Sequence, residues 1–201
     1  MQLYLLLISC FVARVASAAE NIPFSSVIRP REIGIMRDSQ TMHIYGLKTN
    51  IAILVALQNS AGETVVALNN EASVASVEKM LQVFSDRIDK SQWKNLQCAI
   101  IAPGNMKKVG RKGKWVNEFD VEAFKLIRYL KAAVRKGIPK GVASHSKLYP
   151  YIPSTKDPVI YNGGRFGRYT MPEVKVVKTE QGDIEWSYRG DGHCKHLLLG
   201  R

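Results

Sequence analysis

Apolar residues follow two different spacings along this chain, and these spacings predict strands and helices. A nearly continuous apolar run at 50–57 has the length of a strand that is buried on both faces. A turn cluster at 59–62 and a second apolar run at 64–68 complete a predicted hairpin. Residues 96–102 predict another buried strand, which we expect to end at 103–105 and to be followed by a loop rich in Gly and Lys.

Two other segments place apolar residues at steps of three and four, the spacing of an amphipathic helix. Ser73 stands in the N-cap position of the first, whose apolar face comprises Val74, Val77, Leu81, Phe84 and Ile88. Gly137 and Pro139 stop the second, whose apolar face comprises Val121, Phe124, Ile127, Leu130 and Val134. Each segment is therefore expected to cover part of a sheet.

The remaining apolar patterns are short and predict strands around these helices. They occur on both sides of a polar turn within 32–45, at 141–151, and at 174–177 and 184–186 across a turn at 181–183. Strands, helix, strand, helix, strands is the order of a mixed β-sheet packed against two helices, an α/β fold. We expect one basic domain at 20–189 and a C-terminal tail at 190–201.

The amino terminus has the pattern of an export signal. Leu3 to Val12 is an uncharged apolar run, and 15–19 is a patch of small residues, so we predict a signal peptide at 1–19 and a secreted or periplasmic protein. The run is too short to cross a bilayer, which needs about 20 apolar residues, and no second stretch approaches that length. No Lys or Arg precedes the run, so a buried amino-terminal helix is the alternative. Cys10 lies in a lipobox-like run, so lipidation of this residue is a further, weaker alternative.

The chain carries a formal net charge of +12, which falls to about +11 when 1–19 are removed. Such a protein attracts anionic partners: an acidic protein, a glycan, nucleic acid or an anionic membrane surface. Basic residues gather in the loop after 105 and along the second helix, and we predict an anion-binding patch comprising Lys107, Lys108, Arg111, Lys112, Lys114, Arg128, Lys131 and Arg135. The alternative is a solvated face that only keeps the protein soluble.

Cysteines and histidines are few. Cys98 and Cys194 remain after export and allow one disulfide, although Cys98 also fits a buried core position. The run 193–196 (HCKH) offers three ligand types, but structural zinc needs about four and no second cluster exists, so we predict neither metal nor cofactor. Weak candidates for nucleophilic catalysis are Cys194, His145 and His196. The chain has no P-loop, G-x-G-x-x-G or G-x-S-x-G motif.

The order of elements over 33–186 resembles the chemoreceptor glutamine deamidase family (CheD-like). The run 163–168 (GGRFGR) matches that family's late Gly-Gly-x-x-Gly-Arg element. The resemblance implies a catalytic Cys on the strand at 50–57 and a catalytic His on the strand at 64–68. This chain has Ala52, or a neighbour that is not Cys, at the first place and Val66, Ala67 or Leu68 at the second. A methyl group cannot attack a carboxamide carbon, so the resemblance implies a relative without its nucleophile.

These observations support three hypotheses. The first is an exported, non-enzymatic binding protein for an acidic partner or anionic surface. The second is a cysteine-dependent amidohydrolase or protein deamidase that uses Cys98 or Cys194 with His145 or His196. The third is a secreted nuclease, which the charge allows but which lacks an evident cluster of carboxylates. We favour the first, because neither cysteine lies where a thiolate is expected to form.

Overall fold

The computed structural model describes residues 27–36, 41–45, 47, 49–109, 114–151, 174–179, 183–188 and 196–198. Its elements, in chain order, are β1 (Ile33–Ile35), β2 (Thr41–Ile44), β3 (Ala52–Asn59), β4 (Thr64–Asn69), α2 (Val74–Arg87), η2 (Lys90–Gln92), β5 (Trp93–Val109), β6 (Lys114–Phe119), α3 (Val121–Gly137), β7 (Ala143–Tyr151), β8 (Val174–Lys178), β9 (Ile184–Tyr188) and β10 (His196–Leu198). The predicted signal peptide, Cys10 and the run at 163–168 lie outside the described residues.

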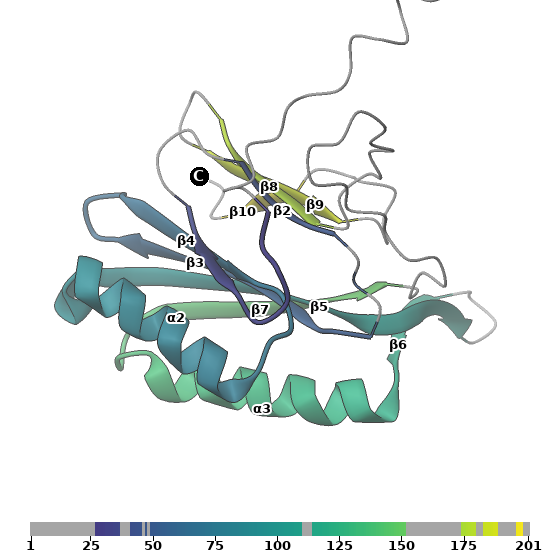
Figure 1. Ribbon diagram of the computed structural model, residues 1–201. Coiled ribbons are helices and arrows are strands. Elements are labelled where there is room, and N and C mark those ends of the chain that lie inside the picture. Colours follow the sequence, from purple (N-terminus) through teal and green to yellow (C-terminus); the bar gives the residue numbers. More distant parts are fainter. Residues whose placement is uncertain are drawn as a thin grey trace, which may run out of the picture.

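The elements form three layers (Figure 1). A six-stranded sheet lies in the middle, with β1, β4, β3, β5 and β6 in that order and β7 also paired to β5. Helices α2 and α3 cover one face of this sheet, and a four-stranded sheet of β10, β9, β8 and β2 covers the other. Strand β7 runs parallel to β5 while the other pairs are antiparallel, so the predicted mixed sheet with two helices is confirmed.

Strand β3 is central to both cores, because its side chains alternate between the two faces. Its helix-facing residues Ile53, Val55 and Leu57 form one core together with buried residues of α2 and α3. Its other residues pack against the four-stranded sheet: Ala52, Leu54 and Ala56. The continuous apolar run is therefore explained by burial on both sides, as predicted.

Both helices begin and end close to their predicted limits. Ser73 accepts a hydrogen bond from the backbone N–H of Ser76, whose side chain accepts one from Ser73, and this capping box fixes the start of α2. The last residue of α3 lies against α2, because a Cβ on Gly137 would be 2.4 Å from Leu81 Cδ1. Glycine at this position lets the two helices approach closely. Neither helix, among the described residues, is long and apolar enough to cross a membrane.

The four-stranded sheet was not predicted as a separate layer. Strands β1 and β2 follow one another in the sequence, yet β1 pairs with β4 and β2 pairs with β8, in different sheets. The predicted hairpin of β8 and β9 is confirmed. Residues 196–198, which were expected in a tail, form β10 against β9. Segments from both ends of the domain therefore form a second apolar layer that packs against β3.

The described residues of the basic segment after Asn105 lie in two paired strands and not in a loop, so for these residues that prediction was wrong. Strand β5 continues through Pro103 and Gly104 to Val109 and pairs with β6. Glycine fits there because a Cβ on Gly104 would be 2.5 Å from the carbonyl oxygen of Glu118. A Pro-Gly pair usually marks a turn, but here it permits the close approach of a neighbouring strand.

The apolar face predicted for α3 is correct in its central part and wrong at its start. Ile127, Leu130 and Val134 are buried against the sheet. Val121 and Phe124 are 71% and 50% exposed, respectively. The first turn of α3 therefore presents apolar surface to solvent.

Candidate functional site

Cys98 and His145 lie on neighbouring strands but on opposite faces of the sheet. In the parallel pairing of β5 and β7, Cys98 is aligned with Ser146 and Gln97 with His145. Aligned residues share a face and successive residues alternate. Since Cys98 belongs to the helix-side core, the imidazole of His145 projects from the other side. The structure therefore gives Cys98 no base from His145.

The thiol of Cys98 is also poorly suited to nucleophilic attack. Burial raises its pKa to about 12, although a hydrogen bond with Ser146 and the charge of Lys131 act in the opposite direction. At neutral pH almost none of it is thiolate, which is the reactive form. Cys98 is a free, buried thiol in this structure, and Cys194 lies outside the described residues, so the disulfide between them stays a prediction.

His145 lines a small pocket of about 240 Å³ on the face away from the helices. The other lining residues are Gln97, Cys98, Ala99, Lys147, Tyr149 and Trp186. Tyr149 and Trp186 meet edge to face with ring centroids 4.7 Å apart, and Tyr188 completes the aromatic cluster. The pocket joins two basic side chains to aromatic surface. Cys98 contributes to this lining, although its side chain belongs to the core on the helix side of the sheet.

Ala52 and Ala67, the positions implied by the deamidase resemblance, lie inside the two hydrophobic cores. Both have no exposed surface. Ala52 packs in the core between the two sheets, whereas Ala67 packs in the helix-side core. Val66 and Leu68, the alternatives for the second position, are buried between the sheets with Ala52. These sites are filled by ordinary packing.

The three basic residues predicted on α3 share one face of that helix. Arg128, Lys131 and Arg135 recur at steps of three and four. The two arginines are exposed, whereas Lys131 is half-buried and near enough to Cys98 for its charge to act on that thiol. Glu122 is the only acidic residue of α3, and its carboxylate is 2.8 Å from Lys125 Nζ. The helix thus carries a cationic stripe, defined here as Arg128, Lys131 and Arg135, with no acidic residue of its own among them.

The hairpin half of the predicted patch is more mixed in charge. Lys107 on β5 lies 3.9 Å from Glu118 on β6, and both side chains are about two-thirds exposed. Lys108 and Lys114 lie on β5 and β6, opposite Trp115 and Val109 in the register. Arg111 and Lys112 lie outside the described residues. The structure therefore supports the helix half of the patch more directly than the hairpin half.

The remaining catalytic and metal candidates are only partly described. His196 is the first residue of β10, and Cys194 is outside the described residues. Among the described residues, no group of three or more His, Cys, Asp or Glu side chains is arranged to hold a metal ion. Buried His43 on β2 has no hydrogen-bond partner for Nδ1 in this part of the chain. Burial and the charge of Lys175 lower the pKa of His43 to about 4, so it is neutral at physiological pH.

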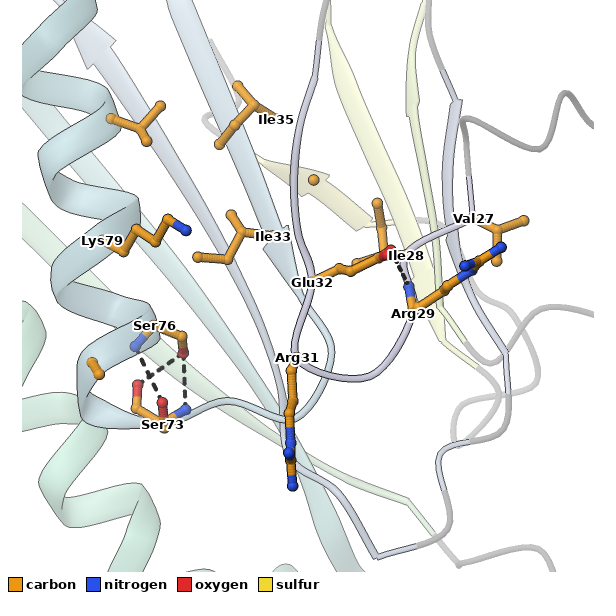
Figure 2. Close-up of a pocket in the computed structure, with 13 residues that line it drawn as sticks. Val27, Ile28, Arg29, Arg31, Glu32, Ile33, Ile35, Ser73, Ser76 and Lys79 are labelled. Carbon is orange, nitrogen blue, oxygen red and sulfur yellow. Dashed lines mark hydrogen bonds between the residues drawn. The ribbon is translucent and has the colours of Figure 1, made fainter.

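A larger groove, which the sequence did not predict, lies between β1 and α2 (Figure 2). Its volume is about 870 Å³. Ile33 and Ile35 point from β1 toward α2, and Lys79 extends from α2 toward Ile33 (Figure 2). Ala75 and Val83 of α2 add apolar lining, and Ser73, Ser76 and residues 27–32 complete the rim. The groove combines an aliphatic wall with polar and cationic ends.

Two buried asparagines at the end of β4, Asn69 and Asn70, support the wall of this groove. The side chain of Asn69 donates to the carbonyl of Glu32 at 2.7 Å, and that of Asn70 donates to Ile28 at 3.4 Å. The backbone N–H of Arg31 donates to the carbonyl of Asn70 at 2.9 Å. Arg31 adopts a left-handed conformation with φ of 67°, which is uncommon outside glycine. These contacts fix the turn from which β1 begins.

Sequence reasoning missed the groove because its parts are far apart in the chain. Its cationic residues Arg29, Arg31 and Lys79 come from the segment before β1 and from the middle of α2. The one local signal was Lys79 itself, which lies within a helix whose apolar face the sequence had identified. Only the pairing of β1 with β4 brings these residues together.

No family model matches the chain, and no curated protein matches it. The resemblance to the glutamine deamidases therefore stays a prediction. What the chain shows by itself is a three-layer α/β domain with a filled place where that resemblance implies a catalytic pair.

Proposed function

We propose that this chain is an exported, non-enzymatic protein whose α3 surface binds an anionic partner. The observation that carries the proposal is the cationic stripe. Arg135 follows Arg128 by seven positions, so the stripe extends about 10 Å along the helix. Phe124, one turn before Arg128 on the same side, adds an exposed aromatic ring. Such a surface suits a partner with several closely spaced negative charges.

The absence of a competent catalytic pair in the described residues supports binding over hydrolysis. Cys98 is buried with a raised pKa, and His145 projects from the opposite face of the sheet. Rapid modification of Cys98 in the folded protein at neutral pH, located by peptide mass mapping, would count against this argument. A thiol with a pKa near 12 should react only after unfolding.

The binding proposal is tested by removing the stripe while the fold is kept. The triple variant Arg128→Gln, Lys131→Gln, Arg135→Gln removes three positive charges from α3. Binding to a DNA duplex and to heparin is then measured over a range of salt concentrations. With the duplex, the slope of log K against log salt should fall by about 2 to 3, since each phosphate contact contributes roughly 0.9. The triple variant should also be retained less strongly on heparin than the unaltered chain.

A matched control removes the same charge from the α2 side. Lys79→Gln, Arg87→Gln, Lys90→Gln changes three exposed cations on or just after α2. This variant should keep most of the binding. Equal losses in the two triple variants, or no loss in either, would show that the stripe is not the binding surface.

Export is tested separately from binding. Removal of 1–19 predicts a mature chain that begins at or near Ala19 or Glu20. Intact mass and amino-terminal sequencing of the protein recovered outside the cytoplasm measure this directly. Protein that stays in the cytoplasm with residues 1–18 attached would contradict the proposed export.

A further inference from the structure

In the part of the chain that the structure describes, no further strand pairs with the β1 edge of the central sheet. Strand β1 stands at the end of the strand order in the described part of the chain. The N–H of Met36 donates to the carbonyl of Val66 at 2.8 Å. Bonded positions alternate along an antiparallel pair, so Gly34 also faces β4. The backbone groups of Ile33 and Ile35 therefore point away from β4.

The side chains of β1 suit an added strand on this edge. Ile33 and Ile35 cover the α2 side, and Gly34 has no side chain on the other side, where a Cβ would be 2.2 Å from Ile28 Cδ1. The groove against α2 continues this aliphatic surface through Ala75 and Val83. An extended segment paired to β1 would place alternate side chains in the groove. Exposed sheet edges are a common site for such strand addition.

The charges at the groove favour an acidic occupant. Lys79 extends into it from α2, and Arg31 lies at its lower end in Figure 2. Glu32, the acidic residue of the lining, is directed away from α2, and its carboxylate accepts the backbone N–H of Arg29 at 2.9 Å. Arg31 Nε is 3.5 Å from the partly exposed carboxylate of Glu71. A carboxylate on the incoming segment would therefore meet Lys79 without a competing acid on the same side.

We propose that the groove between β1 and α2 binds an extended, acidic peptide segment of another protein, which adds to the sheet as a strand beside β1. This site is separate from the stripe on α3 and does not depend on it. The occupant differs as well: the stripe suits a surface rich in charge, whereas the groove requires aliphatic side chains and a free backbone. Backbone hydrogen bonds supply affinity and the groove supplies selectivity.

The experiment uses the full mature chain and a synthetic peptide of about seven residues, enough to span β1 and its flanks at roughly 3.3 Å per residue. The peptide contains threonine, valine and two glutamates and is blocked at both ends. Affinity is measured by calorimetry, and amide exchange by NMR. Binding should slow amide exchange at Ile33 and Ile35, and Lys79→Glu should weaken it about tenfold. Lys90→Glu reverses the charge of an exposed residue beyond the far end of α2 and should leave the peptide affinity unchanged.

Two methylated peptides test strand addition without changing the protein. In each, the backbone nitrogens of alternate residues are methylated, in one register or the other. One of the two should lose binding, because only one set of N–H groups faces β1. Equal binding by both methylated peptides would overturn strand addition. Absence of binding up to about 1 mM would overturn the proposal, since that limit corresponds to only weak association.

Other occupants give distinguishable results. A second copy paired through β1 would appear as a concentration-dependent dimer in sedimentation, with protection of Ile33 and Ile35 in the absence of peptide. That result would reassign the groove to self-association and overturn the proposal. Replacing the glutamates of the peptide with lysines should weaken binding. Unchanged affinity would show that the occupant is not selected for acidity.

Discussion

Helices α2 and α3 lie side by side on the same face of one sheet, yet their outer surfaces differ. Helix α2 has two acidic and two basic residues, Glu78, Asp86, Lys79 and Arg87. Helix α3 has one acidic residue and five basic ones: Glu122 against Lys125, Arg128, Lys131, Arg135 and Lys136. Inward, both helices pack apolar residues into the same core, to which α2 adds the aromatic ring of Phe84. Helix α3 therefore carries a net charge of +4, whereas α2 carries none.

This contrast separates two ways in which a basic protein can use charge. Charged residues that only keep a protein soluble need no particular positions on its surface. A binding surface needs its charges together, and the stripe on α3 meets that requirement. The single cation that α2 directs into the groove has a different setting, because aliphatic residues surround it. Charge on α3 suits a polyanion, and charge on α2 suits one carboxylate.

The largest expected effects concern the faces on which the helices are alike. Phe84→Ala in α2 and Leu130→Ala in α3 each remove a side chain with no exposed surface. We expect losses in the free energy of unfolding of about 3–5 kcal/mol for Phe84→Ala and about 2–5 kcal/mol for Leu130→Ala. Chemical denaturation measures both. A small loss for only one helix would show that the two do not share one core.

The second prediction concerns the pH dependence of the unfolding free energy. It sets the pH range in which the stabilities of helix variants can be compared. His43 has a pKa of about 4 in the folded protein against an ordinary value of 6.5. The unfolded chain therefore binds more protons between these values, and stability falls as the pH drops from about 6.5 toward 4, by up to about 3 kcal/mol. His43→Phe should flatten this part of the stability curve. An unchanged slope would mean that other groups, not His43, cause it.

The third prediction separates position from net charge. Into the triple variant of α3 that lacks the cationic stripe we introduce Glu78→Lys and Asp86→Lys on α2. These changes restore and exceed the positive charge that the triple variant lost. Duplex binding should stay about tenfold weaker than that of the unaltered chain, because the new charges are on the wrong helix. Recovery of the original affinity would show that net charge alone controls binding, and the contrast between the helices would lose its functional meaning.

The smallest expected effects concern the helix starts. Ser73 caps α2 through reciprocal hydrogen bonds with Ser76, whereas Asp120 makes no capping hydrogen bond to α3. Ser73→Ala should cost about 1 kcal/mol of unfolding free energy, and Asp120→Ala only a few tenths. Thermal and chemical denaturation compare the two. A larger loss at Asp120 would reverse the expected order.

Most elements were predictable because their signals are local. The run at 50–57 specifies a strand buried on both faces, and the spacing of Val77, Leu81 and Phe84 specifies the inner face of α2. The stripe on α3 follows from helical spacing in the same way. Each of these signals depends on neighbours within a few residues. The structure confirmed the elements and placed the stripe on one face.

The errors and omissions arose where distant segments meet. Pro103 and Gly104 indicated an end to β5, but β6 pairs across them, and only the register shows why glycine is needed. The stretch 32–45 indicated two successive strands without indicating that they belong to different sheets. Alternation places side chains on a face, yet it does not specify which strand lies beside which. That information was absent from any single window of sequence.

By itself, the sequence determined the α/β class, the two helices, the surplus positive charge and the lack of a recognisable catalytic motif. Only the tertiary structure decided that Cys98 and His145 are separated by the thickness of a sheet, and that β1 and α2 enclose a groove. The physical reason is that composition and periodicity act locally, whereas pockets and catalytic pairs depend on strand pairing between residues far apart in the chain.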